Sequence, residues 1–184
     1  MKLIVKNMVC SHCIAAVRNL LTSRGFSITN ISLGDVEINE TLTSEQMDDL
    51  SAGLTELGFE LLDDPRSQLV EQIRIAIQEW ARMDGSRPKI SDYLSDRFCR
   101  EYSYLSKLFS EVRGITIEKF AILHRVEYGK ELLCYKQLTI SEISYMLDYS
   151  SPAHFSKSFK ETTGMSPKQF RDQNYHYRKS LSDL

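Results

Sequence analysis

The chain has 184 residues, which is enough for one large or two small domains. Hydrophobic residues make up 42% of it and aromatic residues 10%, as in globular proteins, and no apolar run reaches the roughly 18 residues that would predict a membrane span. The first residues, MKLIVKNMVCSHC, contain no hydrophobic signal region with a cleavage site. We therefore expect a cytoplasmic protein whose four cysteines do not form structural disulfides.

Charge is divided unevenly along the chain. Residues 1–65 hold 4 basic and 10 acidic side chains, a balance of −6, whereas residues 66–184 hold 19 basic and 15 acidic side chains, a balance of +4. The two balances add up to the formal net charge of −2. The asymmetry indicates two domains, and the basic half is the candidate for binding nucleic acid.

The first 64 residues predict a small domain of mixed helices and strands. Strand and helix periodicities alternate, Gly34-Asp35 reads as a hairpin turn, and Thr43 with Gln46 forms a capping-box pattern. The order is strand, helix, strand, strand, helix, strand, at residues 2–6, 13–21, 26–33, 36–38, 47–57 and 59–62. This order predicts a ferredoxin-like βαββαβ domain over residues 1–64.

Cys10 and Cys13 lie where the first strand meets the first helix. The dipole at a helix N-terminus lowers the pKa of a thiol, and two thiolates three residues apart suit one soft ion such as Cu(I) or Zn(II). The motif MVCSHC, together with the element order, resembles the heavy-metal-associated domain of copper chaperones and metal-pumping ATPases. Met8, Cys10 and Cys13 fit that family's pattern, whereas Asn7 and Val9 replace its usual Gly and Thr.

Other interpretations of the cysteines remain open. The pair is alternatively inert, or a thioredoxin-like redox pair, although the first Cys follows too little chain for the βαβ context of that motif. His12 lies between the two cysteines and is a candidate third ligand, but we expect it to face solvent. Cys99 and Cys134 have no paired spacing, and we expect them to be buried small residues.

Asp63-Asp64-Pro65 predicts a break between the domains. After it, apolar residues at helical spacing predict a helix over residues 67–81, with its inner face formed by Leu69, Ile73, Ala76, Ile77 and Trp80. The second predicted domain spans residues 66–184.

The second domain contains an internal repeat. Residues 102–120 read YSYLSKLFSEVRGITIEKF and residues 152–170 read PAHFSKSFKETTGMSPKQF, and a shift of 50 positions superposes six identical residues. Each copy follows a short helix pattern and a turn of about four residues. Helix, tight turn and helix predict two helix-turn-helix units, at about residues 90–113 and 140–163.

The tail ISEISYMLDYSSPAHFSKSFKETTGMSPKQFR resembles the signature of the AraC/XylS family of bacterial transcription regulators. The resemblance covers about residues 67–175 and implies seven helices, two DNA-reading modules and one long helix between them. It implies that Ser103, Ser106 and Lys107 face one major groove, and that Ala153, Ser156 and Lys157 face the next. At both turns, Cys99 and Asp148 stand where the family usually has a left-handed Gly.

The predicted connecting helix runs from about Ile117 to Tyr135. At about 1.5 Å per residue it spans roughly 30 Å, close to the roughly 34 Å of one turn of B-DNA. The connector therefore suits two recognition helices in successive major grooves.

Together these features predict an α+β chain: a ferredoxin-like domain followed by an all-α double helix-turn-helix domain. We interpret it as a DNA-binding transcription regulator modulated by a soft metal, with operator DNA as its partner and RNA polymerase or a second copy of the chain as further candidates. The alternatives are the same regulator with a metal-free N-terminal domain for dimerisation or partner contact, and a metal-trafficking protein with a protein-docking helical domain. No spacing typical of an enzyme site is present, so no catalytic residue is predicted.

Overall fold

The structure is a computed structural model that describes residues 1–83, 87–134 and 138–173. The chain divides into two compact units, residues 1–75 and residues 76–184, which are considered separately below. No helix in the described part of the chain is long and apolar enough to cross a membrane.

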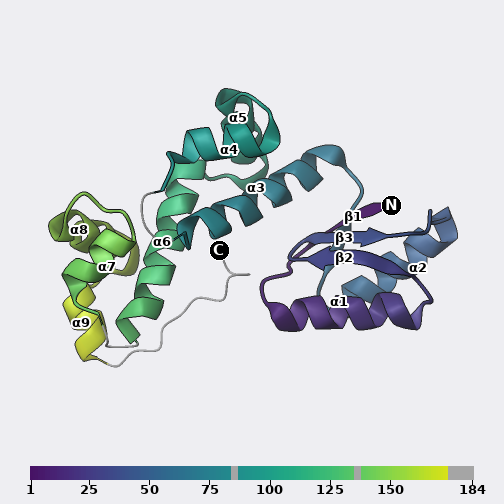
Figure 1. The fold of residues 1–184 in the computed structure, drawn as a ribbon, viewed down its shortest axis with the longest axis horizontal. Coiled ribbons are helices and arrows are strands. Elements are labelled where there is room, and N and C mark those ends of the chain that lie inside the picture. Colours follow the sequence, from purple (N-terminus) through teal and green to yellow (C-terminus); the bar gives the residue numbers. More distant parts are fainter. Residues whose placement is uncertain (84–86, 135–137, 174–184) are drawn as a thin grey trace. The chain divides into compact units, whose positions relative to one another are not determined.

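The first unit contains a four-stranded sheet (Figure 1). Its elements are β1 (Lys2–Lys6), α1 (Ser11–Ser23), β2 (Ile28–Ser32), β3 (Asp35–Ile38), α2 (Ser44–Glu56) and β4 (Glu60–Leu62). The strands lie in the order β2-β3-β1-β4, and every neighbouring pair is antiparallel. The order of strands and helices along the chain is the one predicted from the sequence.

Local sequence signals explain where these elements begin and end. The β2–β3 turn contains Gly34 with φ +75°, a conformation that glycine adopts without steric cost. At the start of α2 the hydroxyl of Thr43 accepts from the backbone N–H of Gln46, while the Gln46 side chain accepts from the backbone N–H of Thr43. Both features were predicted from the sequence.

One core joins the sheet of the first unit to its two helices. It combines inward-facing strand residues with residues of α1 and α2, namely Leu3, Val5, Met8, Val17, Leu21, Val36, Ile38, Leu50, Leu54 and Phe59. Ile4, between Leu3 and Val5, is also buried. Because successive side chains of a strand point to opposite faces, both faces of the sheet are covered at β1.

Helix α3 (Pro65–Ala81) begins only two residues after β4. The Asp64 carboxylate accepts from the backbone N–H of Ser67 at 2.7 Å, and Gln68 donates to the carbonyl of Leu62 at 2.7 Å. The predicted break at residues 63–65 is therefore a helix start rather than a flexible loop. The division between the compact units falls inside α3, after Ile75.

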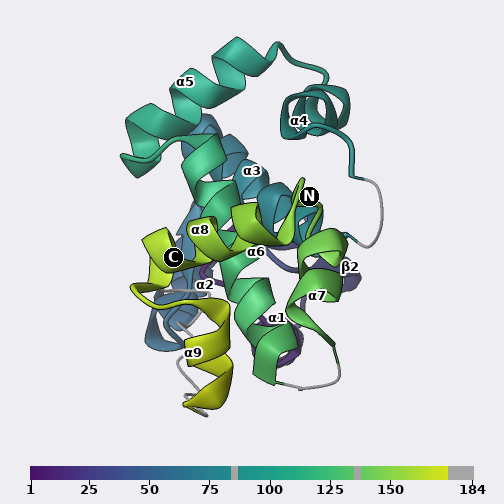
Figure 2. The same cartoon turned by 90° about the vertical axis from the view of Figure 1, so that its left-hand side faces the viewer.

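The second unit is helical wherever regular structure is described (Figures 1 and 2). After the end of α3 come α4 (Ile90–Phe98), α5 (Tyr102–Arg113), α6 (Ile117–Cys134), α7 (Ile140–Met146), α8 (Pro152–Thr163) and α9 (Pro167–Asp172). Helices α3 to α9 correspond to the seven helices that the resemblance implied. Tyr135, the expected end of the long helix, lies outside the described residues.

The connecting helix α6 is buried on several sides, as expected of a helix that packs against both modules. Its buried residues are Ile117, Phe120, Ala121, His124, Val126, Glu127, Gly129, Lys130, Leu132 and Leu133. Gly129 lies so close to the second module that an added Cβ would come within 3.1 Å of Leu147 and 3.2 Å of Phe155. Its 18 residues span about 27 Å at about 1.5 Å per residue.

Candidate nucleic-acid interface

Two helix-turn-helix units are formed by α4 with α5 and by α7 with α8. In the first turn Cys99 has φ +50°, and in the second Asp148 has φ +56°. Both residues therefore adopt the left-handed backbone for which the resembling family uses Gly. The two recognition helices α5 and α8 end at Gly114 and Gly164, which are also left-handed, with φ +68° and +82°.

The repeat in the sequence is also a repeat in burial. From residue 102 to residue 120, every position shares its burial class with the position 50 residues later, except positions 110 and 116. The same aromatic pair closes each module: Phe109 and Phe120 have ring centroids 5.4 Å apart, and Phe159 and Phe170 have centroids 5.6 Å apart. Two equivalent modules therefore present equivalent outer faces.

Each recognition helix presents the residues predicted to contact DNA away from its core. Lys107 and Lys157 are 79% and 75% exposed. Ser103 and Ala153 are exposed, and Ser106 and Ser156 are half-buried. The inner faces of the two helices are buried, at Leu105, Leu108, Phe109, Phe155 and Phe159.

A carboxylate accompanies each of these lysines one helical turn later. The Lys107 ammonium lies 4.0 Å from the Glu111 carboxylate, and the Lys157 ammonium lies 4.0 Å from the Glu161 carboxylate. The two glutamates occupy equivalent positions of the internal repeat, but the sequence predicted no role for them.

At the N-terminal end of each recognition helix, two side chains form a contact that was not predicted from the sequence. In the first module the Arg100 guanidinium stacks over the Tyr104 ring, 5.5 Å from its centroid. In the second, the Ser150 hydroxyl lies 3.0 Å from Nδ1 of His154. The members of each pair are four residues apart, and all four side chains are exposed.

Two arginines hold the second turn from outside its own module. Arg87 donates to the carbonyl of Leu147 at 2.7 Å, and Arg125 of α6 donates to the carbonyls of Leu147 and Asp148, the latter at 2.8 Å. These acceptors lie at the C-terminal end of α7, where backbone carbonyls have no partner within the helix. The arginines supply those partners.

Aromatic rings enclose the same arginines. Arg125 lies over the Tyr149 ring at 4.0 Å and over the Trp80 ring at 5.8 Å, and Arg87 lies over Trp80 at 5.7 Å. Burial lowers the pKa of Arg125 from its usual value. The Arg125 guanidinium still remains charged at neutral pH, because the usual pKa of arginine lies far above neutrality. The arginine pair therefore fixes the second turn against α6 with charged hydrogen bonds.

In the first unit, Cys10 and Cys13 lie together at the start of α1. Their sulfur atoms are 3.5 Å apart, Cys10 is exposed and Cys13 is half-buried. The neighbouring backbone N–H and thiol of Cys13 lower the pKa of the Cys10 thiol. The pair is thus accessible and poised to lose a proton.

The donor set fits a soft ion with few ligands. Two sulfurs at this separation can bind one ion between them, and thiolates favour Cu(I) or Zn(II). Among the residues that the structure describes, no group of three or more His, Cys, Asp or Glu side chains converges on one point. His12 is exposed, as expected. A four-coordinate zinc site would therefore need ligands beyond those in the described part of this chain.

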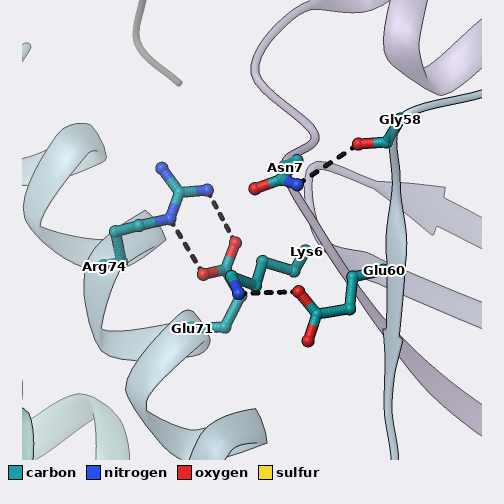
Figure 3. A network of polar contacts seen from close by, with 6 residues as sticks. All are labelled: Lys6, Asn7, Gly58, Glu60, Glu71 and Arg74. Carbon is teal, nitrogen blue, oxygen red and sulfur yellow. Dashed lines mark hydrogen bonds and ion pairs between the residues drawn. The ribbon is translucent and has the colours of Figure 1, made fainter. Parts of the chain in front are cut away.

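The loop before the cysteines is tied to the start of β4, the strand that pairs with β1 (Figure 3). Asn7 has φ +73° at the position where the resembling family has Gly, and its side chain donates to the carbonyl of Gly58 at 3.2 Å. Lys6 and Glu60 form an ion pair at 2.7 Å. These contacts hold the loop shape despite the missing Gly.

Figure 3 also shows a buried ion pair of α3 beside these contacts. The Arg74 guanidinium donates two hydrogen bonds to Glu71, at 3.0 and 2.8 Å, and the two side chains are only 6% and 4% exposed. Both charges therefore have partners although they are removed from water, as buried charges require.

The remaining cysteines differ from expectation. Cys99 was predicted to be buried, but it is exposed, at the left-handed C-cap position of α4. Cys134 is half-buried. The thiol of Cys99 reaches only the carbonyl of Asp96, at 3.7 Å, so it caps the helix end loosely.

The helical region is similar to regions of known transcription regulators. Residues 94–173 match the family model for a helix-turn-helix domain. An uncharacterized HTH-type transcriptional regulator of Staphylococcus aureus is 33% identical over 111 residues, which are 60% of this chain and 14% of that protein. The regulatory protein PocR of Salmonella typhimurium is 31% identical over 85 residues, which are 46% of this chain and 28% of that protein. The chain thus spans less than a third of the length of these relatives.

Among solved structures, the C-terminal domain of AraT, a response regulator from Geobacillus stearothermophilus, is similar with a TM-score of 0.51 and 26% identity. The match covers 63% of this chain and 95% of that one. A probable AraC family transcriptional regulator from Rhodopseudomonas palustris has a TM-score of 0.50 at 20% identity, covering 58% of this chain and 96% of that one. The helical region has the fold of these regulators' domains.

Proposed function

Because residues 94–173 match a helix-turn-helix domain and have the fold of AraC-type regulators, we propose that the chain is a sequence-specific transcription regulator that binds double-stranded operator DNA. The observation that supports this most is the structural repeat: two recognition helices with equivalent buried faces and equivalent exposed lysines. A protein-docking helical domain would not need two copies of one outer face.

In this proposal α5 and α8 enter two major grooves. Ser103, Ser106 and Lys107 contact the first, and Ala153, Ser156 and Lys157 contact the second. Lysine reaches base edges or phosphates, serine donates or accepts at either, and the alanine methyl group packs against a thymine methyl. The helix α6 sets the separation of the two modules, and Arg87 with Arg125 keeps the second one in place.

For the first unit we propose a ferredoxin-like domain of the heavy-metal-associated kind, with Cys10 and Cys13 as ligands of one Cu(I) or Zn(II). The supporting observations are the sulfur separation of 3.5 Å, the exposure of Cys10 and its lowered pKa. When bound, such an ion replaces the thiol protons and changes the charge at the start of α1. A ligand shifts a conformational equilibrium only by its differential affinity for the two states, here about 1–3 kcal/mol if the coupling is ordinary allostery.

A specific observation favours a second candidate for this unit. Only two ligands converge among the described residues, so a metal-free unit that dimerises the chain or contacts RNA polymerase is the alternative. The DNA-binding part of the proposal is the same in both versions.

The test begins with protein purified without oxygen, whose metal content is measured together with its binding to random DNA fragments. Selected DNA is then titrated with wild type and with Cys10→Ser/Cys13→Ser, each with and without Cu(I) or Zn(II). Metal-dependent affinity in wild type alone supports a metal-responsive regulator. Tight metal binding without any change in DNA affinity rejects the sensor, absence of metal binding favours the metal-free unit, and absence of DNA binding in every state rejects the regulator.

A further inference from the structure

Resting on the DNA-binding function proposed above, we infer that His154 is a further DNA-contacting residue, and that it makes DNA binding by the second module dependent on pH. In this inference the ring of His154 contacts a backbone phosphate beside the major groove and takes up a proton when it does so. Tyr104 occupies the equivalent position of the first module, so the proton uptake belongs to one module only.

His154 lies in the first turn of α8, the recognition helix of the second module. The residues in the N-terminal part of such a helix are the ones that enter the groove. His154 is exposed and lies three residues before Lys157, so the two side chains are neighbours on one side of the helix. Phosphate contacts make up about half or more of protein–DNA hydrogen bonds, and a side chain beside Lys157 can reach the phosphates that border the groove.

Contacts with the preceding turn orient the His154 ring. Its Nδ1 lies 3.0 Å from the Ser150 hydroxyl, and the ring meets that of Tyr149 with centroids 5.3 Å apart and planes at 89°. Tyr149 is buried, and its hydroxyl lies 3.1 Å from that of Ser158, so the ring rests on a fixed support. Within the described residues the imidazole hydrogen-bonds through Nδ1 alone, which leaves Nε2 for a phosphate oxygen.

The charged groups around the histidine ring have both signs. On α8 itself, Lys157 lies one turn later, 4.0 Å from the Glu161 carboxylate. In the turn before α8, Asp148 precedes Tyr149, and from α6 the Arg125 guanidinium lies over the Tyr149 ring at 4.0 Å. Because cations and carboxylates are both present, the protein does not hold the ring in one charge state, and a nearby phosphate can decide it.

The direction of the pH dependence follows from the chemistry of histidine. Its usual pKa is about 6.5, so its charge changes between about pH 5 and 8. A phosphate next to the ring stabilises the protonated form, in which both nitrogens donate. Binding of DNA therefore takes up a proton, and linkage requires the affinity for DNA to rise as the pH falls towards 6.

The first module has a permanent charge where the second has a titratable one. Tyr104 is exposed at the start of α5, and the Arg100 guanidinium stacks over its ring at 5.5 Å. Arginine stays charged over the whole range, and the hydroxyl of a tyrosine, with a usual pKa of about 10, does not titrate there. The first module therefore lacks the pH dependence that His154 gives the second.

The experiment measures the affinity of the full chain for DNA selected from a random library, from pH 8 to pH 6 at constant ionic strength. We expect wild type to bind about fivefold more tightly at pH 6, as a phosphate that stabilises the protonated ring by about one pK unit would require. His154→Gln keeps a hydrogen-bond donor but cannot be protonated, so its affinity should change by less than about twofold. Tyr104→His places the same group in the first module and should make the pH dependence steeper than in wild type.

The outcomes separate the inference from the function on which it rests. A pH dependence that disappears in His154→Gln and grows in Tyr104→His supports the inference. A wild-type affinity that does not rise as the pH falls, or a rise that His154→Gln retains, overturns it and leaves DNA binding intact. If His154→Gln binds too weakly to be measured, Tyr104→His decides, and a pH dependence equal to that of wild type overturns the inference. Absence of DNA binding at every pH overturns the proposed function itself.

Discussion

Three residues with side chains adopt a backbone conformation that favours glycine: Asn7, Cys99 and Asp148. Asn and Asp tolerate the left-handed region better than other residues, whereas the Cβ of Cys99 adds a steric cost of about 1–2 kcal/mol. The resemblance to known families identified all three as replacements of Gly, but it could not tell whether the backbone changed with the residue. In the structure all three residues have a positive φ.

Replacing Cys99 with Gly should therefore stabilise the protein. We expect the free energy of unfolding to rise by about 1 kcal/mol because the steric cost of Cβ is removed. The extra conformational entropy that Gly gives the unfolded chain offsets part of this gain. Denaturant unfolding of wild type and Cys99→Gly measures the difference. Cys99→Ala, which removes the thiol but keeps Cβ, is the control and should give no comparable gain; an equal gain in both variants would assign the effect to the thiol instead.

The hydrogen bonds of Arg125 could not be predicted from the sequence. Its acceptors, the carbonyls of Leu147 and Asp148, are 22 and 23 residues away and have no sequence signature, because every residue carries a carbonyl. Only the packing of α6 against α7 brings them together.

We expect Arg125→Met to destabilise the second module by about 2 kcal/mol. The substitution removes two hydrogen bonds from a charged donor, one to the partly buried carbonyl of Leu147 and one to the exposed carbonyl of Asp148. Chemical unfolding monitored by Trp80 fluorescence provides the measurement. Arg82→Met is the matched control. Arg82 is 49% exposed in its ion pair with Glu131, so this substitution should lower the free energy of unfolding by less than about 1 kcal/mol. Equal costs for the two variants would contradict the role given to Arg125.

The elements follow closely from local sequence signals. The capping box at Thr43 forms as predicted, a second forms at Thr139, Ser166 and Pro167 start α9, and Gly114 and Gly164 end the recognition helices. These signals act over three or four residues, so they can be recognised without knowledge of the fold. The close approach of Gly129 to Leu147 and Phe155 depends on tertiary packing and could not be predicted in this way.

One contact between elements makes the first module sensitive to acid. The hydroxyl of Tyr102, at the start of α5, donates to the Glu118 carboxylate in the first turn of α6 and lowers its pKa. A carboxyl group whose pKa is lowered by folding stabilises the folded state above its unfolded pKa, which is about 4.3 for Glu. That contribution is lost as the pH falls through the pKa of the folded state.

Glu118→Gln should accordingly be less stable than wild type at neutral pH, by less than about 1 kcal/mol because the pair is partly exposed. The difference should shrink as the pH is lowered from about 5 to 3. Unfolding free energies of the two proteins across this range provide the measurement. A difference that stays constant with pH would show that the Glu118 charge makes no contribution.

At the scale of the whole molecule, α3 belongs to both compact units. Its first eleven residues, 65–75, fall in the first unit and its last six, 76–81, fall in the second. The sequence placed a domain boundary at residue 65, and that boundary stays a prediction about which fragment folds alone. A six-residue helix is too short to be stable in isolation.

A fragment of residues 66–184 should therefore fold, with a cooperative urea transition, and should be more stable than a fragment of residues 76–184. The longer fragment keeps all but the first residue of α3, whereas the shorter one begins within it. Should residues 66–184 be unfolded under conditions where the full chain is folded, the boundary lies elsewhere.

If α5 and α8 are the DNA-reading surfaces, removal of their exposed lysines should weaken binding to DNA. Binding of selected DNA is measured at several salt concentrations for wild type, for Lys107→Ala/Lys157→Ala and for Lys2→Ala/Arg18→Ala, a control with the same loss of charge in the first unit. We expect steep salt dependence in wild type and a loss of at least about 1 kcal/mol of binding free energy per lysine in the first double variant alone. Unchanged affinity in the lysine variant, or an equal loss in the control, would contradict it.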